Sequence, residues 1–153
     1  CGARLEPVLA NLRAMRSLGW WLEVTTLVIP GLNDSEAELG DLAGFLAQEL
    51  GAHTPWHVSR FRPSYRLQHL PPTPLATLER AVEIGRGRGL EHVYLGNVPG
   101  HRFGDTFCPG CGRVLIARRG FAVAGMFMDH GACPGCGRAV AGVWDGQGAA
   151  VLA

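Results

Sequence analysis

The chain has 153 residues, of which 47% are hydrophobic and 18% are charged, and its formal net charge is +1. This balance excludes a disordered chain and gives no general attraction to nucleic acid or to acidic surfaces. The sequence has no apolar run of about 18 residues and no signal-peptide pattern, so we expect a cytoplasmic protein that does not bind membranes.

Residues 1–100 alternate between helical and extended patterns. The elements that we expect are a helix from Leu5 that ends at Gly19, a strand over 20–28, a helix over 36–50, a strand over 55–61, a helix over 75–84 and a strand over 92–97. This alternation predicts an α/β unit with a parallel sheet. Because three strands cannot close a barrel, and because a helix begins almost at once, we expect the carboxy-terminal part of a longer protein. Its missing amino-terminal half would then be a partner.

Local signals mark the ends of these elements. Pro30-Gly31 stops the first strand, and Ser35 with Glu38 forms a capping box for the helix that follows. Thr73-Pro74 is typical of an N-cap and a first-turn proline. The third helix is predicted to dissolve into the glycine-rich run over 85–89.

Two C-P-G-C-G knuckles dominate the remainder of the chain. Short β-like runs follow the first knuckle at 114–116 and 121–128, and a last run follows the second at 140–144. The domain division that we predict is an α/β unit over 1–100, a linker over 101–106, a zinc ribbon over 107–145 and a tail over 146–153.

Each knuckle places two thiol groups on one tight turn, so the four ligands of a tetrahedral metal site are predicted to be Cys108, Cys111, Cys133 and Cys136. Disulfides are disfavoured in a chain that we expect to be intracellular. We favour zinc, because a module of this size has too little core to fold alone. Iron is the alternative, since the same spacing describes rubredoxin knuckles. Cys1 stands apart from this pattern.

A nucleic-acid role for the ribbon receives little support. Arg113, Arg118 and Arg119 lie near Phe121 and Phe127 in the sequence, and these residue types suit phosphate and stacking contacts. There is no dense basic stripe, so nucleic acid is an unlikely partner.

Three segments resemble one enzyme family. Leu22–Asp34 resembles the fifth-strand region of radical S-adenosylmethionine enzymes related to the pyruvate formate-lyase activating enzyme. Trp56–Pro63 resembles the next barrel strand of one branch, and Tyr94–His101 resembles the segment after it. With its terminal cysteine pairs, the chain is similar to the carboxy-terminal half of the AmmeMemoRadiSam system radical SAM enzymes. The resemblance implies a partial (β/α) barrel followed by a small zinc-ribbon or rubredoxin-like β domain.

This resemblance also implies a ligand at the carboxy-terminal mouth of the barrel. Family members hold a 4Fe–4S cluster and S-adenosylmethionine there, and they use a 5′-deoxyadenosyl radical on a substrate. Thr25, Leu27 and His57 would face the nucleoside or the substrate, and strand parity places Ser59 on the face of His57. We expect a ligand to meet Leu27 and His57 first, with Thr25 and Ser59 beneath, and Glu23 deeper still.

The chain departs from the family at the cluster. No three of its cysteines have the C-x-x-x-C-x-x-C spacing, and the glycine-rich motif for the methionine amine is missing. We therefore expect this chain to be inactive alone and its parent to be the enzyme, acting on a small molecule or a protein. Two alternatives remain: a zinc-ribbon module that binds protein or nucleic acid, and a rubredoxin-like electron carrier.

Overall fold

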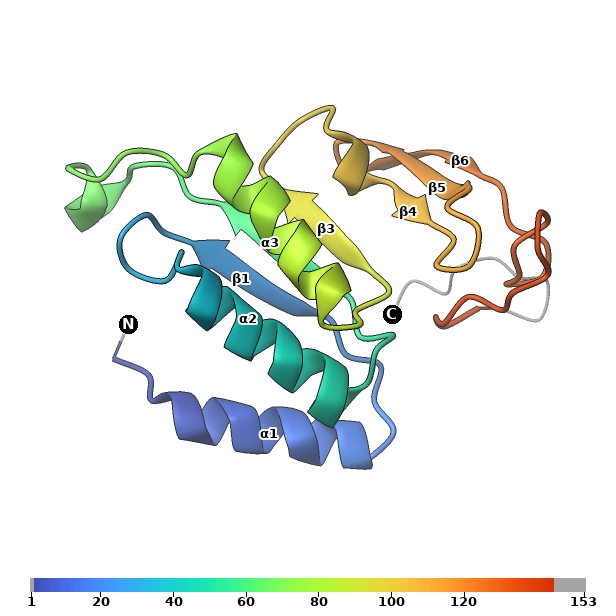
Figure 1. Ribbon diagram of the computed structural model, residues 1–153, viewed down its shortest axis with the longest axis horizontal. Coiled ribbons are helices and arrows are strands. Elements are labelled where there is room, and N and C mark those ends of the chain that lie inside the picture. The colour runs from blue at the N-terminus through green and yellow to red at the C-terminus, as the bar shows by residue number, and fades with distance from the viewer. Residues whose placement is uncertain (1, 145–153) are drawn as a thin grey trace.

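The computed structural model describes residues 2–144 and consists of a parallel α/β unit and a smaller antiparallel β unit (Figure 1). Cys1 and the predicted tail lie outside the described residues. The elements are α1 (Leu5–Ser17), β1 (Val24–Val28), α2 (Glu36–Phe45), the π-helical η1 (Leu46–Leu50), β2 (Trp56–Arg60), the 3₁₀ turn η2 (Tyr65–Leu67), α3 (Leu75–Gly87), β3 (Val93–Gly96), the 3₁₀ turn η3 (Arg102–Gly104), β4 (Thr106–Phe107), β5 (Val114–Arg119) and β6 (Ala122–Met126).

The first sheet is parallel, as predicted, with the strand order β1-β2-β3. Helices α2 and α3 cover one face of this sheet, and α1 lies beside α2 (Figure 1). The covered face holds the main core, which includes Val28, Leu39, Leu46, Trp56, Val58, Leu78, Val82, Val93 and Leu95. Alternate side chains on β1 and β2 remain partly or fully exposed on the other face. The sheet thus has one buried face and one open face.

Trp56 and Gly85 fix the distance between β2 and α3. The Trp56 side chain is fully buried, and its indole Nε1 donates a hydrogen bond of 2.9 Å to Thr26 Oγ1. A Cβ atom on Gly85 would lie only 2.9 Å from Val93 Cγ2 and 3.0 Å from the Trp56 ring. The third helix ends at Gly87, within the glycine-rich run over 85–89, as predicted. Gly85 has a second effect, because its lack of a side chain allows α3 to approach the sheet closely.

The predicted helix caps differ in their outcome. Ser35 caps α2 as expected, since its Oγ accepts a hydrogen bond from the Glu38 amide and donates one to the Glu38 carboxylate. Thr73 does not cap α3, whose N-cap is Pro74. Its buried hydroxyl instead accepts from the Phe61 amide at 2.9 Å and donates to the Val28 carbonyl at 2.6 Å. Thr73 therefore ties together the carboxyl ends of β1 and β2.

The second sheet is antiparallel, with the order β4-β5-β6. Its small core is formed by Cys108, Leu115, Ile116, Cys133 and Val140. The predicted strand over 140–144 is wrong within the part of the chain that the structure describes. Pairing after the second knuckle consists of isolated bridges, such as the one between Ala132 and Ala139, because the glycine-rich turns interrupt the ladder.

The segment between the two sheets packs against both units. Phe103 of η3 packs on the core of the α/β unit, and Tyr94 Oη lies 2.9 Å from Thr106 Oγ1. Arg138, beyond the second knuckle, donates a hydrogen bond of 2.6 Å to Glu91. The structure thus holds the ribbon against the carboxy-terminal end of α3 and the edge strand β3.

The helices of the described residues are short or polar for a membrane-spanning segment. Between residues 2 and 144, none of them combines the length and the apolar character that crossing a bilayer requires.

Candidate metal centre and open sheet face

The two knuckles have nearly the same backbone geometry. In the first, the Cys108 amide donates to the Arg113 carbonyl at 2.8 Å, and the Gly112 amide donates to the Cys108 carbonyl at 2.9 Å. In the second, the Cys133 amide donates to the Arg138 carbonyl at 2.9 Å, and the Gly137 amide donates to the Cys133 carbonyl at 2.8 Å. Both closing glycines have φ of +72°, a conformation that a side chain would strain. The repeated C-P-G-C-G-R sequence thus forms the same turn twice.

Within each turn, a backbone amide points at the first sulfur. The Gly110 amide lies 3.3 Å from Cys108 Sγ, and the Gly135 amide lies 3.4 Å from Cys133 Sγ. Such bonds stabilise a thiolate, which is the form that binds metal.

The β hairpin between the knuckles brings all four sulfurs together. Cys108 Sγ lies 3.6 Å from Cys136 Sγ, Cys111 Sγ lies 3.6 Å from Cys133 Sγ, and all four sulfurs lie within 4.8 Å of one another. The thiols are free, and these separations exceed by far the ~2.05 Å of a disulfide bond. Four sulfurs at 2.3 Å around a tetrahedral zinc ion would be roughly 3.8 Å apart. The donor set therefore fits a single metal ion.

The thiol pKa values also describe a cluster that favours a cation. Burial opposes ionisation of Cys133, but the amides of Gly135 and Cys136 outweigh it and lower its pKa to about 6. The Arg138 amide favours the thiolate of Cys136, yet the adjacent Cys108 sulfur and burial raise the pKa of Cys136 to about 11. Four thiolates this close repel one another, and a divalent cation at their centre would relieve that repulsion.

An arginine from each knuckle crosses over the other knuckle. A Cβ atom on Gly110 would lie 3.1 Å from Arg138 Cδ, and one on Gly135 would lie 2.9 Å from Arg113 Nε. The second glycine of each C-P-G-C turn therefore leaves room for the opposite arginine. Each knuckle thus has the positive side chain of the other knuckle packed against its turn. The hairpin arginine Arg118 is engaged elsewhere, with hydrogen bonds to Gly104 O and Thr106 Oγ1.

The open face of the parallel sheet carries the four residues that the sequence indicated for a ligand. The strand register pairs Thr25 with His57 and Leu27 with Ser59. Leu27 is 43% exposed, and Thr25 is also exposed, so this face is accessible. The structure thus brings the four side chains to one face, while their role in binding remains a prediction.

The predicted layering of these residues is wrong. We expected Leu27 and His57 nearest the strand ends, but Leu27 pairs with Ser59 and lies nearer the carboxyl ends than the Thr25–His57 pair. Parity assigns a face to each side chain but gives no offset between neighbouring strands, which the structure supplies. A side chain at Gly96, the β3 partner of Ser59, would collide with the Ser59 hydroxyl.

His57 is held by neighbours that the sequence analysis did not connect. Its Nε2 lies 2.7 Å from Glu23 Oε2, and Trp21 Nε1 donates to Glu23 Oε1 at 3.1 Å. The His57 ring stacks on Tyr94, with 5.1 Å between centroids. The hydrogen bond from His57 lowers the pKa of Glu23, even though burial opposes this shift. Tyr94 was missed as a site residue, although its alternation with Val93 and Leu95 could have placed it on this face.

Tyr94 also joins the open face to the ribbon. The guanidinium of Arg118 lies over the Tyr94 ring at 5.5 Å, and both side chains contact the Thr106 hydroxyl. Burial raises the pKa of the Tyr94 phenol. The open face therefore ends where the ribbon begins.

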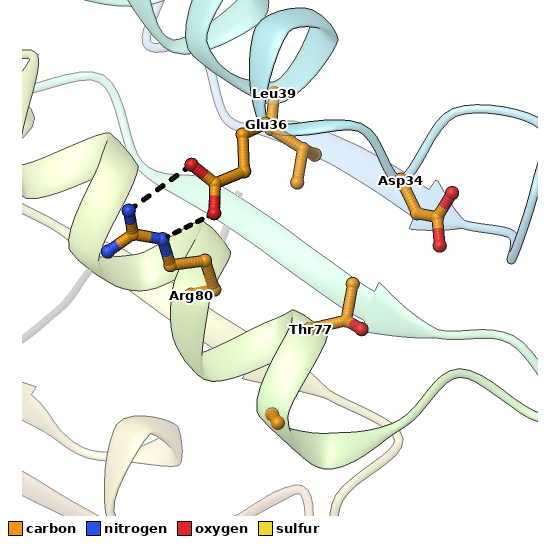
Figure 2. Close-up of a pocket in the computed structure, with 6 residues that line it drawn as sticks. Asp34, Glu36, Leu39, Thr77 and Arg80 are labelled. Carbon is orange, nitrogen blue, oxygen red and sulfur yellow. Dashed lines mark hydrogen bonds and ion pairs between the residues drawn. The ribbon is translucent and has the colours of Figure 1, made fainter.

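A separate cleft lies between the amino-terminal ends of α2 and α3, with a volume of about 280 Å³ (Figure 2). Its most polar feature is a bidentate ion pair, in which Arg80 Nε and Nη2 lie 2.9 and 3.2 Å from the two Glu36 oxygens. Arg80 Nη1 also binds Glu83 at 2.8 Å. Because this guanidinium is already neutralised, the cleft offers little to a charged ligand.

No family model matches the chain. The uncharacterized protein MJ0808 of Methanocaldococcus jannaschii is 48% identical over 118 residues, which cover 77% of this chain and 35% of that protein. This chain thus spans about a third of the length of its curated relative. A domain of the pyruvate-formate lyase-activating enzyme of Bacteroides vulgatus has a similar structure, with a TM-score of 0.55 and 18% identity over 63% of this chain and 56% of that domain. The chain therefore shares the fold of an activating-enzyme domain.

Proposed function

We propose that this chain is the carboxy-terminal part of a radical S-adenosylmethionine enzyme of the AmmeMemoRadiSam type, with a metal-bound ribbon attached. The observation that carries this proposal is the open face of a three-stranded parallel sheet whose fold is that of an activating-enzyme domain. An open, polar sheet face is what a partial barrel would present once its other strands were removed. The amino-terminal strands are the partner that we propose for this face.

The side chains on the face suit a nucleoside or a polar substrate. His57 stacks on Tyr94 and is oriented by Glu23, while Thr25 and Ser59 add hydroxyl groups and Leu27 adds apolar surface. These groups could bind a ring system and donate or accept a few hydrogen bonds. Bound S-adenosylmethionine would supply the radical chemistry, and the residues of this chain would hold and orient the ligand.

The 4Fe–4S cluster does not fit this chain. The cysteines of this chain are Cys1 and the four of the knuckles, and the four knuckle sulfurs lie together as the ligand set of one metal ion. The cluster ligands of the proposed enzyme would therefore come from outside these 153 residues. We propose that the chain alone does not cleave S-adenosylmethionine.

For the ribbon we propose a structural zinc ion held by Cys108, Cys111, Cys133 and Cys136. The small core of the ribbon supports this proposal, because a module with so few buried apolar side chains needs a metal to fold. An iron ion in the same site would instead favour a rubredoxin-like electron carrier. Metal analysis together with a visible spectrum of the purified chain distinguishes the two metals.

The enzyme proposal is tested with the longer protein that contains this chain. After iron–sulfur reconstitution and reduction, that protein should form 5′-deoxyadenosine from S-adenosylmethionine, whereas the 153-residue chain should not. Formation of 5′-deoxyadenosine by the isolated chain, above a control without protein, would contradict the assignment of the cluster to the remainder of the enzyme.

A further inference from the structure

A groove of about 540 Å³ lies between the carboxy-terminal end of α3 and the first knuckle, beside the metal centre. It spans the two units, because one wall comes from α3 and the turn after it and the other from η3, β4 and the knuckle. The lining residues that matter are Arg86, Glu91, Arg102, Phe107, Cys108 and Arg138.

The charges in this groove are unbalanced. Of its three guanidinium groups, that of Arg138 is paired with Glu91 at 2.6 Å. Between residues 2 and 144, no carboxylate lies within ion-pair distance of Arg86 or Arg102, and neither guanidinium makes a hydrogen bond to a protein group. Burial and the nearby charge of Arg102 both lower the pKa of Arg86. Two unpaired positive charges therefore face the same space.

Aromatic packing holds these two guanidinium groups in place. The Cζ atoms of Arg86 and Arg102 each lie 4.8 Å from the Phe103 ring centroid, and Arg102 Cζ lies 5.9 Å from the Phe107 centroid. Phe103 is itself packed against the core of the α/β unit. The cation–π contacts thus fix the positions of the groups without using their N–H donors.

Backbone amides of the following turn engage carbonyl groups at the end of α3. A helix carboxy-terminus carries partial negative charge on its free carbonyls. Here the Gly85 carbonyl accepts from the Leu90 amide at 3.0 Å, and the Arg86 carbonyl accepts from the Gly89 amide at 3.0 Å. Two of the terminal carbonyls are therefore already satisfied.

We propose that this groove binds a phosphate group, with Arg86 and Arg102 as its ligands. The planar guanidinium fork matches the spacing of phosphate oxygens, and two forks provide the charge to balance a dianion. The phosphate group is that of a small molecule, either free phosphate or a phosphate monoester. This binding is independent of S-adenosylmethionine chemistry.

A competing explanation involves the neighbouring metal centre. Four thiolates with a divalent ion carry a net charge of −2, and Cys108 lines the groove, so the arginines could serve only to balance that charge. The two explanations differ in what the arginines control. A phosphate site requires them for anion binding, whereas charge balance requires them for metal retention.

The test uses the zinc-loaded 153-residue chain in a phosphate-free buffer. Inorganic phosphate and glycerol phosphate are titrated by NMR and calorimetry, with acetate at equal ionic strength as the reference anion. Arg86→Met and Arg102→Met keep an unbranched apolar stem over Phe103 but remove the charge. Arg66→Met, which removes a guanidinium stacked on the exposed Tyr65 outside the groove, is the matched control.

We expect saturable binding of at least one phosphate probe, weakened about tenfold by each groove variant and unchanged in the control. The zinc content and the melting temperature of all three variants should equal those of the unsubstituted 153-residue chain. Two results would overturn the proposal: no saturable phosphate binding, or phosphate binding that Arg86→Met and Arg102→Met leave intact, whether or not these variants lose zinc.

Discussion

His57 Nε2 lies 2.7 Å from Glu23 Oε2 on the open face of the parallel sheet. This contact joins the residue before β1 to the second residue of β2 and sets the orientation of the imidazole ring. Because Nε2 is engaged by the carboxylate, Nδ1 is the ring nitrogen left for a ligand in the function that we propose. Glu23 is therefore a positioning residue for His57 in the function that we propose.

The Glu23–His57 contact predicts a small dependence of stability on pH. The pKa of Glu23 is lowered in the folded state from its ordinary value of 4.5, so the contact stabilises the fold above that pH. This stabilisation should be lost as the pH falls from about 5 to about 3. Because the side chain is half exposed, the effect should stay below about 1 kcal/mol. Denaturant unfolding of Glu23→Gln should show a weaker decline over this range than the parent chain, and an identical decline would count against the contact.

The metal centre predicts a selective loss of structure in the ribbon. Cys111→Ser and Cys136→Ser should each lose the metal and unfold the residues after about Thr106, because the ribbon has only a small core of its own. The α/β unit should keep its helical signal. Metal analysis and amide exchange measure the two effects, with Cys1→Ser as the control that retains the metal. Full metal retention in both knuckle variants would refute the site.

Acid should release the same metal. The ligands must be thiolates, so protons compete with the metal, and affinity should fall steadily as the pH is lowered below neutrality. Metal release followed with a chelating dye measures this dependence. An affinity that does not change between about pH 7 and pH 5 would mean that the thiols are not the ligands.

The contact between Gly85 and Trp56 predicts a loss of stability from a substitution that should favour the helix. Gly85→Ala would gain roughly 1 kcal/mol in helix propensity, but its Cβ would press on the Trp56 and Val93 side chains. We expect a net loss of about 1–2 kcal/mol in the free energy of unfolding. Gly87→Ala, in the same helix turn with open space around it, should not destabilise the chain. Equal stabilisation by both substitutions would contradict the close packing.

The buried hydroxyl of Thr73 predicts a loss of stability when it is replaced by the methyl group of valine, which has nearly the same size and shape. Thr73→Val removes the hydroxyl that binds both the Phe61 amide and the Val28 carbonyl, and it leaves these buried groups unpaired. The expected loss is about 1–3 kcal/mol in the free energy of unfolding. Thr77→Val, on the half-buried side of α3, is the control and should change stability little. A Thr73→Val variant as stable as the parent chain would show that the hydroxyl bonds contribute nothing.

Much of the fold could be predicted from periodicity and local signals. The βα alternation gave the parallel sheet, Ser35 and Glu38 predicted the start of α2, and the knuckle spacing predicted that four sulfurs would meet. These features depend on neighbours in the sequence. Their physical causes are short-range, so they can be recognised without knowledge of the tertiary structure.

The failed predictions depend on contacts between segments that are distant in the sequence. Thr73 is a good N-cap residue, but its hydroxyl is used by two strand ends instead. The close packing of α3 on Trp56 at Gly85 was not predicted either, because it depends on the sheet and not on the helix itself. The offset between β1 and β2 reversed the predicted order of His57 and Ser59, because side-chain parity does not fix strand register.

The most direct test of the proposed function uses the longer protein that contains this chain, after iron–sulfur reconstitution. Three forms of this longer protein are compared: the unsubstituted protein, His57→Ala, and Trp56→Ala as a control for loss of stability. For each, we measure S-adenosylmethionine affinity, 5′-deoxyadenosine formation and melting temperature. We predict that the parent protein cleaves S-adenosylmethionine and that His57→Ala binds it about three- to tenfold more weakly with little change in melting temperature. Trp56→Ala should act through stability, since it leaves a buried cavity. A reconstituted parent protein that neither binds S-adenosylmethionine nor forms 5′-deoxyadenosine would contradict the proposed function.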